Sequence, residues 1–544
     1  MKIENPILPG FNPDPSIVRV DEDYYIATST FEWYPGVQIH HSRDLKHWAL
    51  VTRPLDRAAQ LDMRGDPDSG GVWAPCLSHA DGLFWLIYSD VKRRDGAWKD
   101  SHNYLVTAPA IEGPWSDPVH LNSSGFDPSL FHDADGRKWL LNMIWNHNRQ
   151  GGNRFGGIVM QEYSVQEGRL VGEIHNIYRG TDHKLVEGPH LYRRDGFYYL
   201  LTAEGGTGYD HAVTMARSRD LFGPYETVPA KHVLTSKDTD PDHLLQRAGH
   251  ADIVETQNGE HFMVHLCSRP LPETRRAVTG AGIHADDVRR SPMGRETAIQ
   301  RLVWEEGAFP RLAQGGVAPA AEIDGPDLPE APVDPIPARR TFAGGLPPEF
   351  QWLRNPDRDR LFEVTDGVLR LYGRESPGSQ FEHALVARRQ DALAYSAETE
   401  INVTPGDYQH FAGLIAWYGR NKFHYLAVTA DEAGGRVLTI YSCAADWPDA
   451  RIAYPIEPIS LPKEGTLRLG CDVDGAGLRF RYALPDGDWQ DTGVVLDQSA
   501  ISDEAGNGPG NNFTGAFVGM CAHDTSGRGR TADFLSFTYE VRHG

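Results

Sequence analysis

Three carboxyl side chains open three copies of an internal repeat, and they are the residues of this chain best equipped for chemistry. Asp14 lies in the segment Asn12–Pro15, Asp127 in Phe126–Pro128, and Glu187 begins Glu187–Pro189. Two carboxyl groups that face each other across a pocket are the minimum needed to cleave a glycosidic bond, since one protonates the leaving oxygen and the other acts on the nucleophile. A third carboxylate beside the acid would keep the acid's pKa high through repulsion between like charges.

The carboxyls belong to a repeat of five copies, each with an opening segment, a short turn and an aromatic-rich run. The openings are Asn12–Ile17, Trp73–Leu77, Phe126–Leu130, Glu187–Leu191 and His250–Val254. The runs are Tyr24–Ala27, Phe84–Tyr88, Lys138–Leu141, Phe197–Leu200 and His261–Val264. Copies that recur every 50 to 65 residues or so, roughly the length of a four-stranded blade with generous loops, are typical of a β-propeller. The sequence therefore predicts a five-bladed β-propeller.

A second recurring segment supports the repeat. It follows its blade opening by about 30 residues and precedes the expected outer strand of the blade. The copies are Ser42–Trp48, Ala110–Trp115 and Ser218–Tyr225.

The three carboxyls occupy matching positions of their repeats. Since the first strand of each blade lines the central channel, we expect Asp14, Asp127 and Glu187 to point into one axial cavity. The alternative is that Asp14 and Asp127, which both precede a proline, cap turns or bind their own backbone amides. Packing does not require three like charges to converge, so the match between three repeats favours a functional site.

Composition limits the partners of the chain. Its 544 residues include 53 basic and 75 acidic ones, for a formal net charge of −22, and 40% are hydrophobic. The length predicts two or three globular domains. The acidic balance argues against nucleic acid, anionic membranes and polyanionic substrates, and favours a neutral substrate.

The N-terminus and the cysteines indicate the location and the redox chemistry of the protein. The segment Met1–Pro6 has no apolar core of a signal peptide, and no later stretch is long enough for a membrane helix, so we expect a cytoplasmic protein. The five scattered cysteines lack CxxC pairs, which indicates neither a disulfide framework nor a cysteine zinc site.

The repeat pattern ends near residue 304 and two further regions follow. The domain prediction is a catalytic propeller at 1–310, a linker at 311–340 rich in Pro, Ala and Asp, and a C-terminal domain at 341–544. Short alternating strands in the last region, such as Val368–Tyr372 and Phe534–Tyr539, predict a lectin-like β-sandwich. No run is periodic enough for a major helix, so the fold class is all-β.

Other residues near the repeat openings suit a sugar. Phe31, Trp73 and Trp145 offer aromatic faces for stacking, although such residues also fill the wedges between blades. Arg295 is placed either to hydrogen-bond substrate hydroxyls or to form a salt bridge within the last blade. His250 is either a core residue or, on the propeller axis, a holder of water around a metal ion.

These segments resemble glycoside hydrolase family 43, specifically its β-xylosidase branch with a C-terminal β-sandwich. The resemblance runs nearly end to end, and its most specific segments are Gly10–Ser16, Thr30–Ile39, Gly70–Pro75, Ser124–Phe131, Glu187–Leu191 and Gly294–Thr297. The segment 272–292, rich in Arg, Ala and Asp, is less familiar, and its part in the pocket rim stays open.

The resemblance implies an exo-acting, inverting β-D-xylosidase that releases xylose from short xylo-oligosaccharides. Asp14 would be the general base, Glu187 the general acid, and Asp127 the residue that tunes and orients Glu187. The pocket would be formed by Phe31, Trp73, Trp145, Thr207, His250, Arg295 and, after the run Gly506–Asn512, Phe513 of the C-terminal domain. No cofactor is required, and a Ca²⁺ or other divalent cation in the channel, near His250, stays open. We expect a homo-oligomer, either dimer or tetramer.

Two other functions compete. An α-L-arabinofuranosidase would use the same fold and carboxylates, and we expect that activity at least as a side activity. A non-catalytic carbohydrate-binding propeller is disfavoured, because binding alone calls for amides and hydroxyls more than for carboxylates that repel one another.

Overall fold

The computed structural model describes residues 1–544 except 151–152, 241, 275–288, 507–512 and 543–544. Its regular elements are strands, apart from two short 3₁₀ helices within the described residues, η1 (Arg358–Arg360) and η2 (Gln498–Ala500). The predicted all-β class is confirmed. Along the described ranges, no helix combines the length and the hydrophobicity needed to cross a membrane.

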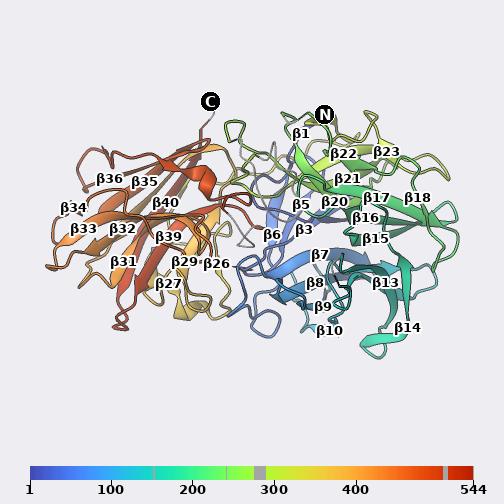
Figure 1. The fold of residues 1–544 in the computed structure, drawn as a ribbon, viewed down its shortest axis with the longest axis horizontal. Coiled ribbons are helices and arrows are strands. Elements are labelled where there is room, and N and C mark those ends of the chain that lie inside the picture. The colour runs from blue at the N-terminus through green and yellow to red at the C-terminus, as the bar shows by residue number, and fades with distance from the viewer. Residues whose placement is uncertain (151–152, 241, 275–288, 507–512, 543–544) are drawn as a thin grey trace.

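The N-terminal part forms five antiparallel sheets arranged as the blades of a propeller (Figure 1). Blade 1 contains β2 (Ser16–Val20), β3 (Asp23–Thr28), β5 (Gln38–Ser42) and β6 (Ala49–Thr52), and blade 2 contains β7 (Gly71–Ala80), β8 (Leu83–Arg93), β9 (Asp100–Ala108) and β10 (Val119–Asn122). Blade 3 contains β11 (Ser129–His132), β12 (Lys138–Trp145), β13 (Phe155–Ser164) and β14 (Arg169–Tyr178). Blade 4 contains β15 (Glu187–Arg194), β16 (Phe197–Glu204), β17 (Ala212–Ser218), β18 (Glu226–Thr227) and β19 (Leu234–Thr235), and blade 5 contains β20 (Gln246–Glu255), β21 (His261–Ser268), β22 (Glu296–Val303) and β23 (Arg311–Leu312).

The sequence repeat corresponds to the first hairpin of each blade. In blade 1 Ile17 pairs with Ile26, and in blade 3 Leu130 pairs with Leu140, so equivalent positions of the openings and the aromatic runs lie side by side. The second recurring segment lies, as expected, between the third and fourth strands, just before β6, β10 and β18. The five-bladed prediction is confirmed.

The segment expected to be a linker at 311–340 contains paired strands at both ends. Its first residues form β23, the outer strand of blade 5, and β24 (Glu322–Asp324) pairs with β1 (Lys2–Glu4). β25 (Arg339–Arg340) already joins the C-terminal domain by pairing with β40. Composition misses these strands because each is only two or three residues long.

The C-terminal part is a sandwich of two antiparallel sheets (yellow to red in Figure 1). One sheet contains β25, β27 (Phe362–Thr365), β28 (Val368–Tyr372), β40 (Thr531–Val541), β30 (Ala394–Asn402), β35 (Leu467–Asp474), β36 (Gly477–Ala483), β37 (Gln490–Asp491) and β38 (Leu496–Asp497). The other contains β34 (Ile459–Ser460), β33 (Arg436–Ala444), β32 (Lys422–Ala430), β31 (His410–Gly419), β39 (Phe517–Asp524), β29 (Ala384–Arg389), β26 (Gln351–Leu353) and β4 (Trp33–Tyr34). The predicted sandwich is confirmed.

The two domains share a sheet. β4 comes from the propeller, yet it pairs with β26 at the edge of the C-terminal sheet, with Trp352 opposite Tyr34. Trp33 stacks on Phe517 of β39, with ring centroids 3.6 Å apart and planes inclined by 13°. This contact fixes the sandwich next to the loop that carries Phe31.

A buried arginine adds charge to this interface. Arg354 is 1% exposed, and its Nη2 donates to Asp68 Oδ1 of the propeller at 2.6 Å while its Nε donates to the Asp66 carbonyl at 2.9 Å. Asp68 Oδ2 accepts a second bond, from Arg420 Nε at 2.9 Å. Removal of one partner of such a buried pair leaves an uncompensated charge.

We therefore expect Arg354→Met to lower the free energy of unfolding by about 3 kcal/mol or more, because Asp68 would stay buried with one cation instead of two. Thermal and urea unfolding measure the effect. Arg358→Met is the matched control, since the Arg358 side chain is 61% exposed. Equal unfolding midpoints for the two variants would contradict the interface assigned to Arg354.

Candidate active site

The three predicted carboxyls meet where three blades open onto the propeller axis. Asp14 and Asp127 lie two residues before β2 and β11, and Glu187 is the first residue of β15. Their side chains are buried, with residues only 5%, 7% and 5% exposed. The three groups lie close enough to interact electrostatically. The charges of Asp14 and Asp127 both raise the pKa of Glu187, and the charge of Asp14 raises the pKa of Asp127. The structure thus brings the three together.

The backbone refines the repeat match. The residue before the last proline of each of the first four openings adopts a left-handed conformation, with φ of 55° at Asp14, 34° at Ala74, 54° at Asp127 and 55° at Gly188. Glu187 therefore lies one residue before the position of Asp14 and Asp127, and the expectation of identical positions is wrong by one residue. A glycine suits the left-handed position, and in this blade the preceding residue carries the carboxyl.

Asp14 is held by two side chains. Arg295 Nη1 donates to its Oδ1 at 2.8 Å, and the Ser29 hydroxyl donates to its Oδ2 at 2.7 Å. Ser29 also accepts the Ala74 amide at 2.7 Å, which fixes the hydroxyl between blades 1 and 2. Both oxygens of Asp14 are thereby oriented.

Asp127 is bonded to the neighbouring blade. The Gly188 amide donates to Asp127 Oδ2 at 3.1 Å, directly after Glu187 in the chain. Burial, followed by the charge of Asp14, raises the pKa of Asp127 to about 8. These hydrogen bonds of Asp14 and Asp127 go to other parts of the propeller, so the alternative in which they bind their own turns does not describe this structure.

Glu187 has the most strongly perturbed carboxyl of the three. Burial is the largest cause, and the charges of Asp127 and Asp14 add to it, so that the pKa of Glu187 lies well above its ordinary value. Its Oε1 has no hydrogen-bond partner among the described residues. The surroundings of Glu187 thus favour its protonated form.

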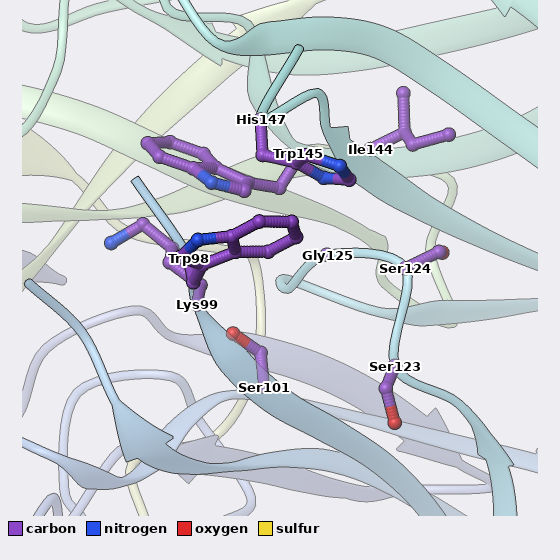
Figure 2. Close-up of a pocket in the computed structure, with 9 residues that line it drawn as sticks. All are labelled: Trp98, Lys99, Ser101, Ser123, Ser124, Gly125, Ile144, Trp145 and His147. Atoms are coloured by element: carbon purple, nitrogen blue, oxygen red, sulfur yellow. The ribbon is translucent and has the colours of Figure 1, made fainter. Parts of the chain in front are cut away.

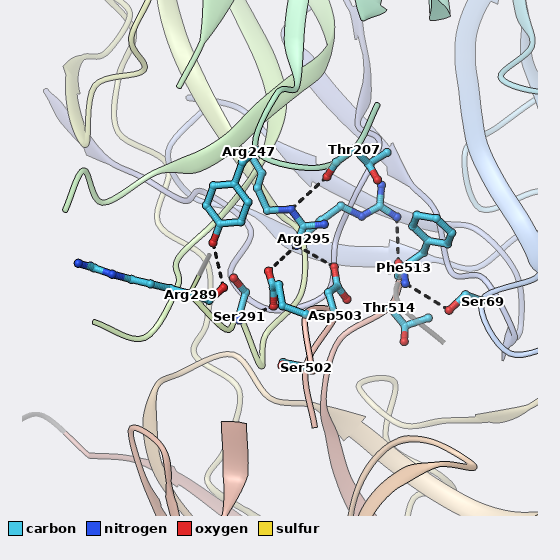
Figure 3. A network of polar contacts seen from close by, with 12 residues as sticks. Ser69, Thr207, Arg247, Arg289, Ser291, Arg295, Ser502, Asp503, Phe513 and Thr514 are labelled. Atoms are coloured by element: carbon cyan, nitrogen blue, oxygen red, sulfur yellow. Dashed lines mark hydrogen bonds and ion pairs between the residues drawn. The ribbon is translucent and has the colours of Figure 1, made fainter. Parts of the chain in front are cut away.

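Arg295 links Asp14 to the C-terminal domain. Besides its bond to Asp14, its Nη2 donates to the Phe513 carbonyl at 2.9 Å (Figure 3). Its Nε has no partner within the described part of the chain. Of the two expectations for Arg295, the salt bridge exists but reaches Asp14 of the first blade rather than a residue of the last blade. The free Nε leaves the sugar-binding expectation open.

Aromatic rings surround the carboxyls. Trp73 lies 5.8 Å from Phe31, 5.4 Å from Phe126 and 6.0 Å from Phe513, measured between ring centroids. Phe126 in turn lies 6.5 Å from Trp145. Phe31, Trp73, Trp145 and Phe513 therefore form one cluster, and their part in sugar binding stays a prediction. Phe126 is an addition that its position beside Asp127 could have suggested.

A buried charge network supports the Phe513 segment. Arg247 Nη1 lies 2.9 Å from Asp503 Oδ2 and 3.0 Å from Glu504 Oε1, which joins blade 5 to the sandwich (Figure 3). The hydroxyl of Tyr418 contacts Asp503 and accepts the Thr514 amide at 3.1 Å. No sequence signal marks Arg247, because its partners Asp503 and Glu504 lie more than 250 positions away in the chain.

Thr207 is part of the same network through its backbone. Its carbonyl accepts a bond from Arg247 Nε at 3.0 Å, and the residue is partly exposed. Part of the less familiar segment 272–292 also reaches the network, since the Ser291 amide donates to Glu504 Oε2 at 2.8 Å. Residues 275–288 of that segment, and 507–512 of the glycine- and asparagine-rich run, lie outside the described residues.

His250 lies between two of the carboxyls. Its Nδ1 is 3.8 Å from Asp14 Oδ1 and 4.0 Å from Asp127 Oδ2. Burial lowers the pKa of His250 to about 4, so the ring is neutral at physiological pH. Calcium takes six to eight oxygen ligands, water among them. The carboxylates of Asp14 and Asp127 lie near the ring, the first of them paired with Arg295, and a cation held through water beside His250 stays a prediction.

Lys99 is a site residue that sequence reasoning missed. Its Nζ lies 4.7 Å from the Trp145 ring centroid and 5.6 Å from those of Trp73 and Phe126. Burial lowers its pKa to about 8. It lies in the loop after β8, outside every repeated segment, so the repeat pattern could not mark it.

Comparison with known proteins shows which family has this fold and this set of residues. Residues 3–310 match the model of glycosyl hydrolases family 43, and residues 339–540 match that of the beta xylosidase C-terminal concanavalin A-like domain. The chain is 54% identical to xylosidase/arabinosidase 43B of Humicola insolens, over 100% of this chain and 98% of that protein. It is 48% identical to a beta-xylosidase of Bacillus subtilis, with both chains fully covered.

A solved structure agrees over the whole length. The crystal structure of xylan beta-1,4-xylosidase from Bacillus halodurans C-125 superposes with a TM-score of 0.93 at 49% identity, and covers 99% of this chain and 100% of that one. The chain therefore belongs to glycoside hydrolase family 43 and is a glycoside hydrolase with the C-terminal domain of that family's β-xylosidases.

Proposed function

We propose that this protein is an exo-acting, inverting β-D-xylosidase that releases xylose from the non-reducing ends of short xylo-oligosaccharides. The observation that carries the proposal is the buried set of three carboxyls, with Asp14 paired to Arg295 and the pKa of Glu187 raised well above its ordinary value. The printed names of the relatives from Humicola insolens and Bacillus subtilis support the choice of substrate.

Two of the carboxyls divide the chemistry. Glu187 transfers its proton to the glycosidic oxygen as the bond between that oxygen and the anomeric carbon breaks. Asp14 takes a proton from a water molecule, whose oxygen forms the new bond on the opposite face of the sugar. The two proton transfers balance, and the product sugar has the inverted anomeric configuration.

Asp127 sets the protonation of the acid. The hydrogen bond from the Gly188 amide holds the Asp127 carboxyl close to Glu187, and the charge of that carboxyl raises the pKa of Glu187. The charge that Asp127 gains above its own raised pKa of about 8 thus favours the protonated form of Glu187, which is the form that catalysis needs.

The C-terminal domain supports exo action. Phe513 lies against Trp73, and its carbonyl accepts a bond from Arg295, so the sandwich supplies one wall beside the carboxyls. A pocket walled in this way holds a chain end and excludes a polymer that passes through. Phe31, Trp145, Thr207, His250 and Arg295 complete the proposed sugar-binding set.

A side activity on α-L-arabinofuranosides is the second candidate. The relative from Humicola insolens is named as both xylosidase and arabinosidase, and the same carboxyls would serve either sugar. The ratio of kcat/KM for the two aryl glycosides separates a primary xylosidase from a primary arabinofuranosidase. The mechanism uses no cofactor. The cytoplasmic location and the dimer or tetramer stay predictions.

The anomeric form of the first product tests the proposal. With a β-xyloside such as xylobiose, proton NMR of early products should show α-xylose, because water attacks from the face opposite the leaving group. Asp14 and Glu187 should then hold their carboxyls roughly 6.5–9.5 Å apart, which leaves room for that water. Initial release of β-xylose would show that Asp14 does not activate water.

A charge-removing variant tests the role of Asp127. Asp127→Asn keeps the shape but removes the negative charge that raises the pKa of Glu187. Glu187 should then lose its proton at lower pH, so the alkaline limb of the kcat/KM profile should move to lower pH, with a large drop in rate. The thermal midpoint should not fall, since a buried repulsion is relieved. An unmoved limb at wild-type rate would reduce Asp127 to a turn residue.

A further inference from the structure

A cavity of about 340 Å³ opens beside the active site between blades 2 and 3. The lining residues that matter here are Trp98, Lys99, Ser101, Ser123, Ser124 and Trp145 (Figure 2). Its volume falls in the range of sites for small molecules, roughly 300–1,000 Å³. The mechanism above gives it no task.

The cavity lies on the same face of the propeller as the catalytic carboxyls. Trp98 and Lys99 belong to the connection between β8 and β9, and Ser123 and Ser124 precede β11 by a few residues, as Asp127 does. Trp145 ends β12 at that same edge of blade 3. In antiparallel sheets these strand ends meet on one face. The cavity therefore lies next to the active site, farther from the propeller axis than the carboxyls.

Two residues belong to both sites. Trp145 is a member of the aromatic cluster, and Lys99 Nζ lies between the Trp145 ring, at 4.7 Å, and the Trp73 ring, at 5.6 Å. A chain that leaves the carboxyls past Trp145 would therefore enter the cavity.

The lining suits a neutral polyhydroxyl molecule. It contains two indoles and three hydroxyls, and none of its residues is a carboxylate. Trp98 is 59% exposed, which is unusual for so large an aromatic side chain, and one neighbour, His147, lies 4.1 Å away between ring centroids. In the view of Figure 2 the indole of Trp98 is drawn between that of Trp145 and the Ser101 side chain. Indole faces stack on the C–H faces of pyranose rings.

A buried hydroxyl in the cavity wall has no partner. Ser101 is 1% exposed, and its Oγ has no hydrogen-bond partner among the described residues. The neighbouring serines differ, because Ser123 Oγ lies 2.8 Å from His102 Nδ1 and Ser124 Oγ accepts a bond from Asn142 at 3.0 Å. A buried polar group without a partner calls for an explanation, and a ligand hydroxyl supplies one.

We propose that this cavity binds the leaving-group side of the substrate, taking the xylose units beyond the one attached to the cleaved bond. The inference rests on the proposed xylosidase function and extends it to substrate length. The indole of Trp98 stacks on a pyranose ring, and the Ser101 hydroxyl bonds to one of its hydroxyls. Xylobiose fills only the two positions at the cleaved bond, so the cavity acts on trimers and longer chains.

Chain-length kinetics test the inference. We expect Trp98→Ala to leave kcat/KM for xylobiose within about twofold of wild type, and to lower it about 3–10-fold for xylotriose and xylotetraose, as expected for the loss of one aromatic contact. Ser101→Ala should show the same selectivity with a smaller loss. Tyr408→Ala is the control, because Tyr408 is 65% exposed on the sandwich, away from the cavity. It should change neither substrate.

Binding provides a second readout that does not depend on turnover. In the inactive Glu187→Gln background, calorimetry with xylotetraose should show an affinity about 3–10-fold lower when Trp98 is also replaced by Ala. Equal losses on xylobiose and xylotetraose, or unchanged kinetics and affinity with xylotetraose, would overturn the proposal. If wild type cleaves no xyloside, the proposed function fails, and the calorimetric comparison alone decides whether the cavity binds the sugar.

Discussion

The electrostatic constraint at the propeller axis is the feature on which the rest of the structure depends. Three carboxyls are buried there, and one guanidinium, that of Arg295, is bonded to only one of them. His250 adds no charge, because burial keeps its pKa low. Since a buried carboxylate without a partner is costly, at least one proton has to stay. Glu187, whose pKa lies well above its ordinary value and whose Oε1 lacks a partner among the described residues, keeps one proton, and Asp127, with a pKa raised to about 8, can hold another.

The same constraint explains why the two domains are joined so firmly. Arg295 reaches both Asp14 and the Phe513 carbonyl, so the position of the base and the position of the sandwich wall are fixed by one side chain. The Arg247 ion pairs and the shared sheet at β4 and β26 hold that wall from two further sides. A catalytic domain alone would leave Arg295 with an unfilled bond and the pocket without Phe513.

Much of this could be predicted from the sequence, because the propeller repeats itself. Five openings, four of them with a proline, and aromatic runs at similar spacing predicted the blades, and Asp14 and Asp127 stand at equivalent left-handed positions. Glu187 was found by the same pattern, although it lies one residue earlier. The sandwich followed from alternating strands, whereas the short strands within 311–340 could not be read from a composition rich in Pro and Ala.

The residues that the sequence did not predict lie outside the repeated segments or depend on partners far away in the chain. Lys99 and Ser101 follow β8 outside the repeat, and the Arg247 partners lie in the other domain. Only folding brings such residues to the axis.

The protonation state of Glu187 is the most direct test of the constraint at the axis. NMR of protein labelled with ¹³C at the glutamate side-chain carboxyls would follow each carboxyl through a pH titration, and Glu187→Gln would identify the resonance by its loss. A carboxyl that stays protonated through neutral pH is the predicted result, because burial and the two neighbouring carboxylates raise its pKa. A Glu187 resonance that titrates in the ordinary range of exposed glutamates would contradict it.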